Sequence, residues 1–336
     1  MTHPKEKKPL GITMGCPVSI GPEIIVKWFT QAGEKAADNI VVLGDIGVLR
    51  ATAAQLKTDI EIQPWLPGAE VVPSCLNVLP LSSLPLAALT PGRPDSITGK
   101  AMVNYVLKAI DLCKHGHLAG MATGPINKKT MHDAGFHYPG HTELLAQHTG
   151  ADRIAMMMAG SRLRVVLVSI HCPLALAPEL LKKADLESLI ALTDLSLKRD
   201  FGITRPRIAV AGLNPHSGEE GLFGSEEQMV IQPAVAAARN TGVHITGPLP
   251  PDTVYYLASH DRFDAVISMY HDQGLIPFKL LHFHDGVNVT LGLPIVRTSV
   301  DHGTAYDIAG TGTANAESLS AAIAMAFLIV ANRTTA

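Results

Sequence analysis

Cysteine is scarce in this sequence, and charged and aromatic residues are sparse as well. The chain has 4 cysteines among 336 residues, and they form no Cys-x-x-Cys pair. This spacing argues against a disulfide framework or a thiolate zinc site and fits a reducing compartment. With 27 Lys+Arg against 30 Asp+Glu, the formal net charge is −3. A chain of this kind has no overall charge with which to hold a nucleic-acid backbone.

Long apolar runs are also missing. The longest, Ala321–Ala331, has 11 residues, whereas a membrane-spanning helix needs about 20. The basic N-terminal segment has no apolar region behind it and does not resemble a signal peptide. No Gly-x-Gly-x-x-Gly follows the first expected strand, so any nucleotide site must differ from the usual dinucleotide fingerprint. We therefore expect a soluble, cytoplasmic protein.

What the chain does have is an alternation of short apolar runs with longer amphipathic ones. The expected strands are Leu10–Met14, Ile40–Leu43, Leu118–Ala122, Leu163–Ile170, Arg207–Leu213, Ala265–Met269 and Gly286–Leu291. The expected helices are Pro22–Gln31, Gly99–Lys114, His141–His148, Pro178–Arg199, Glu226–Asn240, Asp252–Ser259 and Ala316–Ala331. This alternation predicts an α/β fold with a largely parallel sheet.

The length favours two domains, because a single core rarely grows to this size. The stretch Gln63–Pro94 carries seven prolines and no helical period, so we expect an irregular arm or an edge excursion there and not an interdomain linker. A strand that ends near Pro125 offers a domain boundary, and the chain is expected to return to its first domain after about Asp301. The expected domains are therefore residues 1–125 plus 302–336, and residues 126–301.

Three of the fifteen histidines share one position in the pattern. His171, His216 and His271 each closely follow an expected strand. The carboxyl ends of parallel strands share one edge of a sheet, where ligands bind. Three imidazoles brought together there suit a borderline divalent metal ion. The alternative is three unrelated loop histidines. Asp272 could orient an imidazole or cap the following helix.

Several features suit an anionic small molecule. His141 and Thr142 open an expected helix, whose N-terminus attracts anions. The alternative is that these residues only cap the helix and bind no anion. Lys279 and Arg297 flank the strand that contains Asn288, and Arg297 could form a bidentate fork. A Gly-rich loop, residues 302–315, precedes the last expected helix.

Five motifs together resemble the 4-hydroxythreonine-4-phosphate dehydrogenase family of pyridoxal phosphate biosynthesis. They are Pro139–Glu143, Asn214–Glu219, Tyr270–Leu275, Gly286–Pro294 and Arg297–Ala305. The matches run in the expected order from about Gly11 to Ala331. The loop His302–Gly310 also resembles the adenosine-binding loop of isocitrate and isopropylmalate dehydrogenases.

The resemblance implies a two-domain isocitrate/isopropylmalate dehydrogenase-like fold with helices on both faces of its sheets and a cleft between the domains. It implies a homodimer that uses NAD and one divalent ion per site (Zn, Co, Mg or Mn). The implied metal ligands are His171, His216 and His271, with His271 supplied by the partner subunit, so that the site is shared. The implied substrate-binding residues are His141, Thr142, Lys279, Asn288 and Arg297. The implied cofactor residues are Gly303, Asp307, Gly310 and Asn315, and the candidates for proton transfer are Lys279 and Asp252.

The implied reaction oxidises the secondary alcohol of 4-hydroxy-L-threonine 4-phosphate to a 3-oxo acid, which decarboxylates to 3-amino-2-oxopropyl phosphate. The alternative substrate is a phosphorylated sugar acid such as D-threonate or D-erythronate 4-phosphate. Cys16 stands where the family usually has an acidic residue, Ser19 where it has glycine, and His282 and His284 where we expect smaller residues. A metal-dependent hydrolase is a further alternative, but the Gly-rich loop argues against it. A non-catalytic binding protein is another, but the presence of all three expected histidine ligands argues against that.

Overall fold

The structure, a computed structural model, describes residues 8–33, 39–138 and 140–335, so that Pro139 of the first family motif lies outside it. The chain divides into two compact units. The first contains Met1–Asp152 and Leu293–Val330, and the second contains Arg153–Gly292 and Ala331–Ala336. Residues 126–152 and 293–301, expected in the second domain, belong to the first unit. The reason for 293–301 is strand pairing, because Arg297–Ser299 lie in register beside Met121–Thr123.

Parallel strands form the sheet of the first unit, in the order β3-β4-β2-β1-β5-β12. Their bounds are β1 Leu10–Thr13, β2 Ile40–Gly44, β3 Ile62–Pro64, β4 Leu76–Pro80, β5 Gly120–Thr123 and β12 Arg297–Val300. Every residue of β1 and β2 is buried, which explains why these strands are uniformly apolar and do not alternate.

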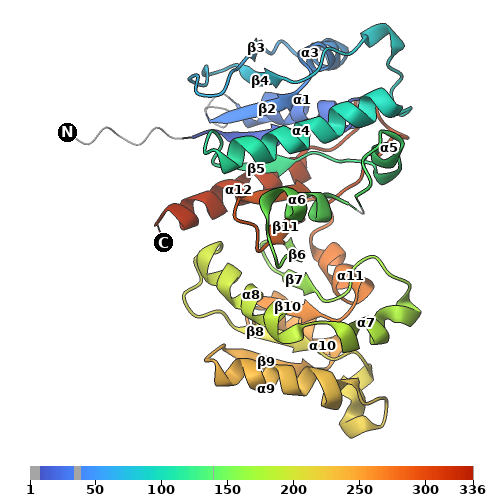
Figure 1. The fold of residues 1–336 in the computed structure, drawn as a ribbon, viewed down its shortest axis with the longest axis vertical. Coiled ribbons are helices and arrows are strands. Elements are labelled where there is room, and N and C mark those ends of the chain that lie inside the picture. Colours follow the sequence, from blue (N-terminus) through green and yellow to red (C-terminus); the bar gives the residue numbers. More distant parts are fainter. Residues whose placement is uncertain (1–7, 34–38, 139, 336) are drawn as a thin grey trace, which may run out of the picture. The chain divides into compact units, whose positions relative to one another are not determined.

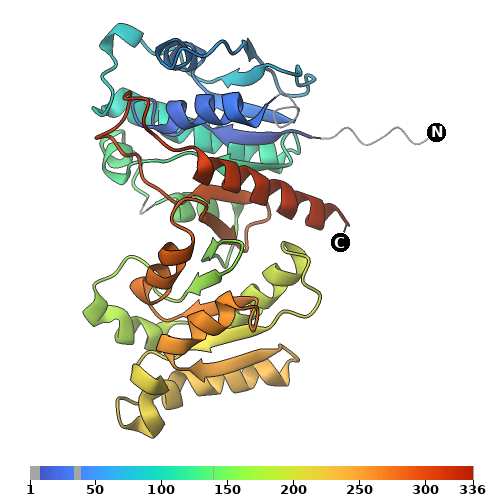
Figure 2. The same ribbon diagram turned by 180° about the vertical axis from the view of Figure 1, so that it is seen from behind.

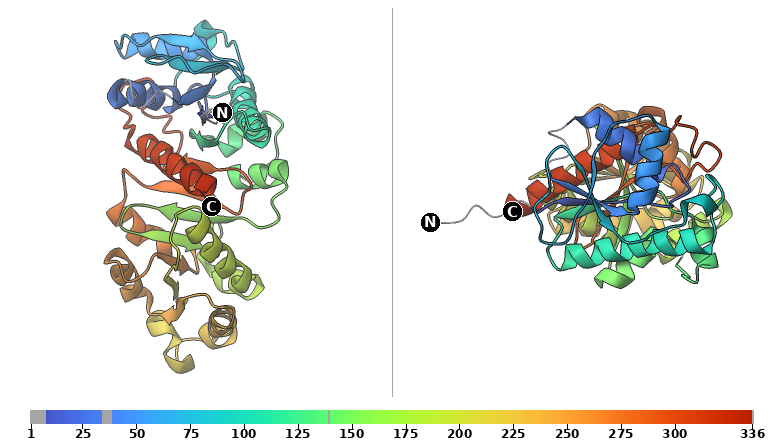
Figure 3. Two further views of the ribbon diagram at one scale, coloured as in Figure 1. Left: turned by 90° about the vertical axis from the view of Figure 1, so that its left-hand side faces the viewer. Right: turned by 90° about the horizontal axis from the view of Figure 1, so that it is seen from above.

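Helices cover both faces of this sheet. They are α1 Gly21–Ala32, α3 Ile46–Gln55, α4 Ser96–Lys114, α5 Lys128–Asp133, α6 His141–Thr149 and α12 Glu317–Thr335, with a 3₁₀ turn η1 at Leu86–Ala88. Figure 1 shows α4 in front of the strands, and Figure 2, from the opposite side, shows α1 and α12 in front. The side view in Figure 3 places α1 and α4 on opposite sides of the strands.

A capping box begins α4. The Asp95 carboxylate accepts the Thr98 backbone N–H at 2.8 Å, and the Thr98 hydroxyl accepts the Asp95 N–H at 2.8 Å. Two of the N–H groups that a helix start leaves unpaired are thereby satisfied.

The second unit has a mixed sheet in the order β11-β6-β7-β10-β8-β9. Its strands are β6 Ala155–Ala159, β7 Arg164–Leu167, β8 Ile208–Ala211, β9 Ile245–Leu249, β10 Ala265–Ser268 and β11 Val287–Leu291. The β6 strand is antiparallel to both β11 and β7, whereas β7, β10, β8 and β9 run parallel. The parallel strands therefore end at one edge, and this edge carries the three histidines.

The helices of the second unit also pack on its strands: α10 on β8 and β10, and α11 on β7 and β10. They are α7 Ala177–Lys183, α8 Leu186–Arg199, α9 Gln232–Asn240, α10 Pro251–Ser259 and α11 His271–Leu281. Shorter turns are η2 Leu174–Leu176, η3 Pro215–Gly221 and the π-helical η4 Glu227–Ile231. Their core includes Val165, Ala209, Val254 and Phe278, all fully buried.

Two expectations about local structure were wrong. The stretch 63–94 is not an irregular arm, because β4 pairs with both β3 and β2 and Leu76–Leu79 are buried, although β3 and β4 do lie at the edge of the sheet, as the alternative expected. The expected helix Pro178–Arg199 is two helices, because Ala184 adopts an extended backbone and Asp185 caps a new helix through the Ser188 N–H.

The last helix, α12, is the one helix within residues 8–33, 39–138 and 140–335 that is long and apolar enough to cross a membrane. One face, which includes Leu319, Ala322, Ile323, Ala326 and Ile329, is buried. The Thr298 hydroxyl of β12 donates to the Ala322 carbonyl at 2.8 Å. These contacts make α12 a core helix of an α/β protein.

Candidate active site

His171 and His271 lie together at the edge where β7 and β10 end. Their ring centroids are 5.8 Å apart. Both line a cavity of about 380 Å³, together with Cys172, Tyr270 and Asp272. His271 Nδ1 donates to Asp272 Oδ1 at 2.7 Å, which leaves Nε2 as the ring's acceptor nitrogen. Asp272 therefore orients an imidazole, and the N-cap position of α11 belongs to Tyr270.

His216 follows the next strand, β8, but it does not line this cavity. It lies in the His216 loop, which we define as residues 214–222, with its ring 6.3 Å from Phe223. Across residues 8–33, 39–138 and 140–335, no group of three or more His, Cys, Asp or Glu side chains is arranged to hold a metal ion. A single chain thus brings His171 and His271 together and places the third expected ligand, His216, after the neighbouring strand β8 and outside the cavity.

The His216 loop has a strained backbone. His216, Ser217, Glu219 and Glu220 all have φ between 41° and 56°, in the left-handed region. Such conformations cost a non-glycine residue about 1–2 kcal/mol each and persist where surrounding structure imposes them.

Glu227 anchors the start of this loop. Its carboxylate is 1% exposed. It accepts the N–H groups of Leu213 and Asn214, each at 2.8 Å, and the Asn214 side-chain amide at 3.0 Å. A buried carboxylate is costly unless it is fully hydrogen-bonded, and here the loop backbone supplies the donors.

In the first unit, His141 opens α6 close to Arg297. Burial and the charge of Arg297 hold the pKa of His141 well below its ordinary value, so the ring is neutral at pH 7. Its Nε2 is shielded from solvent and has no hydrogen-bond partner within the described part of the chain. Thr142, the next residue, is partly buried in the first turn of α6.

Arg297 is the first residue of β12 and is 3% exposed. Its Nε and Nη2 donate to the Thr123 hydroxyl at 3.1 and 2.8 Å. Burial lowers the pKa of Arg297 to about 9. An anion nearby would reverse this effect, because it stabilises the charged form. His141 and Arg297 thus make a buried and polar corner suited to a phosphate or carboxylate.

Three more expected site residues lie in the second unit. Lys279, in the last turn of α11, places its ammonium group 5.7 Å from the centre of the Phe283 ring. Asn288 lies in β11 opposite Met158. Asp252 is exposed in the first turn of α10.

His282, one of the departures from the family pattern, is buried behind Lys279 at the end of α11. Its Nδ1 lies 3.1 Å from both Asp285 carboxylate oxygens, and its Nε2 accepts the Arg162 N–H at 3.3 Å. A Cβ at Gly160 would lie 2.4–2.6 Å from ring atoms of His282. Only glycine at position 160 leaves room for this histidine.

The expected cofactor residues lie in the Gly-rich loop, residues 302–315, in the first unit. Gly303, Asp307 and Asn315 are exposed, and Gly310 has a left-handed backbone with φ 75°. Asn315 Oδ1 accepts the Glu317 N–H at 2.7 Å and so holds the start of α12. Gly310 also lines a cavity of about 150 Å³ formed mostly by α1, α3 and apolar side chains such as Leu86 and Leu89.

Sequence reasoning missed three residues that support these groups: Thr123, Glu227 and Glu23. Thr123 ends β5 and binds Arg297, Glu227 holds the His216 loop, and Glu23 holds the Gly-rich loop. The signal for Glu23 was present, because Gly21-Pro22-Glu23 opens the first helix. Each partner lies more than ten residues away, which a local pattern cannot reveal.

Comparisons with known proteins agree on one family. The family profile described as "Pyridoxal phosphate biosynthetic protein PdxA" matches residues 35–326. A 4-hydroxythreonine-4-phosphate dehydrogenase of Desulforapulum autotrophicum is 52% identical over 322 residues, which cover 95% of this chain and 94% of the relative. A D-threonate 4-phosphate dehydrogenase of Salmonella typhimurium is 44% identical, covering 96% and 98%.

A solved structure gives the same result. The crystal structure of 4-hydroxythreonine-4-phosphate dehydrogenase from Klebsiella pneumoniae matches with a TM-score of 0.87 and 42% identity. The match covers 96% of this chain and 100% of the other.

Proposed function

Because this chain belongs to the PdxA family of pyridoxal phosphate biosynthetic proteins, we propose that it oxidises 4-hydroxy-L-threonine 4-phosphate with a nicotinamide cofactor. The product is a 3-oxo acid, which loses carbon dioxide to give 3-amino-2-oxopropyl phosphate. The observation that carries this proposal is the 52% identity to a 4-hydroxythreonine-4-phosphate dehydrogenase over nearly the full length of both chains.

His141, Thr142 and Arg297 are the proposed phosphate-binding residues. The neutral His141 ring and the Thr142 hydroxyl can donate hydrogen bonds to a phosphate at the start of α6, where the helix dipole also favours negative charge. Arg297 contributes a buried positive charge, already oriented by Thr123. Charge-assisted bonds of this kind are stronger than neutral ones.

His171, His216 and His271 are the proposed ligands of one divalent ion. The donor set fits, because all three imidazoles follow the carboxyl ends of neighbouring parallel strands and Asp272 fixes the tautomer of the His271 ring. A metal ion held there would polarise the alcohol oxygen, and a bound nicotinamide would accept the hydrogen of the alcohol carbon together with two electrons. Lys279 is the proposed carrier of the hydroxyl proton, with Asp252 in a supporting role, and Asn288 is a proposed substrate contact.

We also propose that the site is shared within a cytoplasmic homodimer, with His271 supplied by the partner subunit. In support, one chain does not bring all three histidines together within its described residues. The test mixes His216→Ala with His271→Ala after subunit exchange. Activity should return to about one site per mixed dimer, since both lesions can fall on the same site. Verified exchange without recovery would show that all three ligands come from one chain.

NAD is the proposed oxidant in preference to NADP. Asp307 is exposed in the Gly-rich loop, where a carboxylate can accept from ribose hydroxyls and would repel a 2′-phosphate. No arginine occurs in residues 303–315 of the sequence. Comparable kcat/KM with the two cofactors would refute this preference.

D-Threonate 4-phosphate is the second candidate substrate, favoured by the 44% identity to a dehydrogenase of that compound. The two candidates differ at C2, where one carries an ammonium group and the other a hydroxyl. Turnover of both should be measured with NAD and a panel of divalent ions. A higher kcat/KM for the threonate would replace the first proposal with the second.

A further inference from the structure

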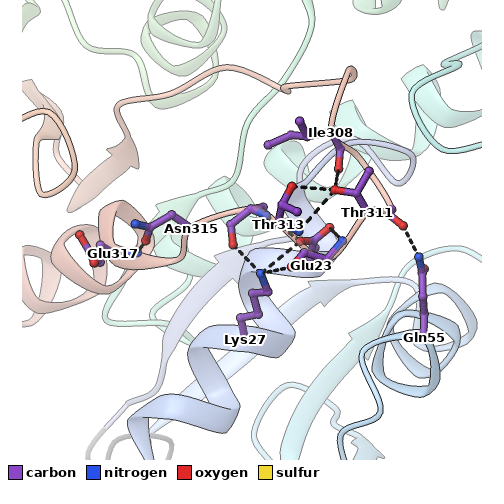
Figure 4. Close-up of polar contacts among 11 residues, drawn as sticks. Glu23, Lys27, Gln55, Ile308, Thr311, Thr313, Asn315 and Glu317 are labelled. Atoms are coloured by element: carbon purple, nitrogen blue, oxygen red, sulfur yellow. Dashed lines mark hydrogen bonds and ion pairs between the residues drawn. The ribbon is translucent and has the colours of Figure 1, made fainter.

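The Gly-rich loop is held from behind by an ion pair on α1. Glu23 lies in the first turn of this helix and Lys27 one turn later, with Nζ and Oε1 3.4 Å apart. Figure 4 shows both side chains directed at the loop near Thr313. The Glu23 carboxylate is 3% exposed, so its charge must be satisfied within the protein.

Both members of the pair bind the same two loop residues, Glu23 as a hydrogen-bond acceptor and Lys27 as a donor. Glu23 accepts the N–H groups of Gly312 at 3.3 Å and Ala314 at 2.8 Å. Lys27 donates to the carbonyl oxygens of Gly312 at 2.6 Å and Ala314 at 2.7 Å. Four backbone groups are therefore paired by one carboxylate and one ammonium group, and the loop cannot shift by a residue without unpairing them.

A third contact comes from α3. The Gln55 side-chain amide donates to the carbonyl of Gly310. Figure 4 shows the Gln55 side chain directed at the loop near Thr311. The loop backbone from residue 310 to residue 314 is thus fixed from two helices. Asp307 and Asn315, on either side of this stretch, remain exposed. We name Glu23, Lys27 and Gln55 the loop clamp.

We propose that the loop clamp is a set of positioning residues for the nicotinamide cofactor. This inference rests on the proposed function, which assigns the Gly-rich loop to the cofactor. The clamp fixes the loop backbone before the cofactor arrives, so binding does not have to order it. Loss of the clamp should therefore weaken cofactor binding while sparing the phosphorylated substrate.

The test uses Glu23→Gln and Lys27→Met in the full-length enzyme. Dissociation constants for NAD come from calorimetry, and KM for NAD and for the phosphorylated substrate come from steady-state turnover. Each variant should raise the Kd and KM for NAD about tenfold, as expected for a lost charge-assisted bond. The KM for the substrate should stay within about twofold. Lys27→Arg should restore much of the loss, because it keeps the charge and the donors.

Lys108→Met is the matched control. Lys108 forms a comparable ion pair with Asp111 at 2.7 Å, but on the exposed surface of α4. This variant should leave all constants unchanged. If Glu23→Gln does not fold, the exposed Gln55→Ala variant replaces it and should raise the Kd for NAD about threefold.

Two outcomes are decisive and distinct. Variants that melt at lower temperature but bind NAD within twofold of wild type would make the clamp purely structural and overturn the inference. A wild-type enzyme that binds no nicotinamide cofactor would instead refute the proposed function, and with it the role of the loop.

Discussion

The Gly-rich loop and the His216 loop are held in the same way but differ in backbone strain. In each, a buried glutamate accepts two backbone N–H groups: Glu23 those of Gly312 and Ala314, and Glu227 those of Leu213 and Asn214. The Gly-rich loop has glycine at two left-handed positions, 310 and 312, and one non-glycine residue, Ala305, with φ 41°. The His216 loop has four non-glycine residues in that region.

This difference indicates two uses of a fixed loop. The Gly-rich loop offers backbone and open space, which suits a large, flat ligand. The His216 loop needs a side chain at the strained position, because an imidazole cannot be replaced by glycine. Under the proposed role of His216 as a metal ligand, strain in the His216 loop would be the energetic cost of presenting that side chain on a tight turn.

The largest expected effect is the loss of metal chemistry. His171→Ala, His216→Ala and His271→Ala should each lower kcat/KM by at least about a hundredfold, since metal activation contributes several kcal/mol. Metal content of the purified proteins is the second readout. His244→Ala, which changes a histidine elsewhere in the same unit, is the control. Full metal occupancy in all three variants would refute the ligand assignment.

The next largest expected effect distinguishes the His216 loop from the Gly-rich loop by the ligand whose binding each one supports. Glu227→Gln should weaken metal binding about tenfold and leave the Kd for NAD unchanged, whereas Glu23→Gln should do the reverse. Exposed Glu220→Gln is the control for the first variant. Metal affinity follows from competition with a chelator and needs no turnover. If Glu227→Gln and Glu23→Gln each weakened metal binding and NAD binding equally, the two loops would be coupled and would not have separate roles.

Substrate binding should depend on the charge of Arg297. Its folded-state pKa is lowered to about 9, so the positive charge is present below that pH and is lost as the pH rises through it. The affinity for the phosphorylated substrate should be flat from pH 7 to 8 and fall by up to about tenfold per unit above 9. Calorimetry from pH 7 to 10 measures this. Arg297→Met should bind weakly with no such fall, and a wild-type curve flat to pH 10 would contradict the role.

A smaller effect concerns His282. Gly160→Ala should destabilise the protein by about 1–3 kcal/mol, because its Cβ overlaps the His282 ring. The double variant Gly160→Ala/His282→Ala should be no less stable than His282→Ala alone. Chemical denaturation measures all three. Additive losses in the double variant would mean that the two sites do not contact in solution.

The smallest expected effect comes from relieving the backbone strain of the His216 loop. Glu220→Gly removes a side chain from φ 56° and should stabilise the folded state by about 0.5–1 kcal/mol. Gly310→Ala in the other loop should destabilise it, since its φ is 75° and the added Cβ would lie 2.9 Å from Pro91. Thermal melts that show the same sign for both changes would remove the distinction between the loops.

Sequence patterns predicted the buried strands best. β1, β2, β5, β7, β8, β10 and β11 were all found where uniform apolar runs predicted them, because burial on both faces leaves a strong signal. The prediction missed β3, β4, β6, β9 and β12. The five residues of β4 are hidden among prolines. The prediction also missed α11, which contains Gly274 and Pro277, two residues that argue against a helix; contacts with the sheet override that local preference.

The candidate site was predictable in part for the same reason. The three histidines follow β7, β8 and β10, which the structure places side by side, so their common edge could be inferred from strand ends. The buried supports were not predictable. Thr123 and Arg297 are 174 residues apart in the chain, and only the pairing of β5 with β12 brings them together.

The packing of His282 over Gly160 also fixes an order of evolutionary events. A histidine at position 282 is accommodated without loss of stability only where position 160 already lacks a side chain. Once His282 is present, replacing Gly160 by any other residue lowers stability, so the glycine at position 160 becomes required. Lineages that carry the histidine should therefore keep Gly160 invariant, while those with a smaller residue at 282 should let position 160 drift.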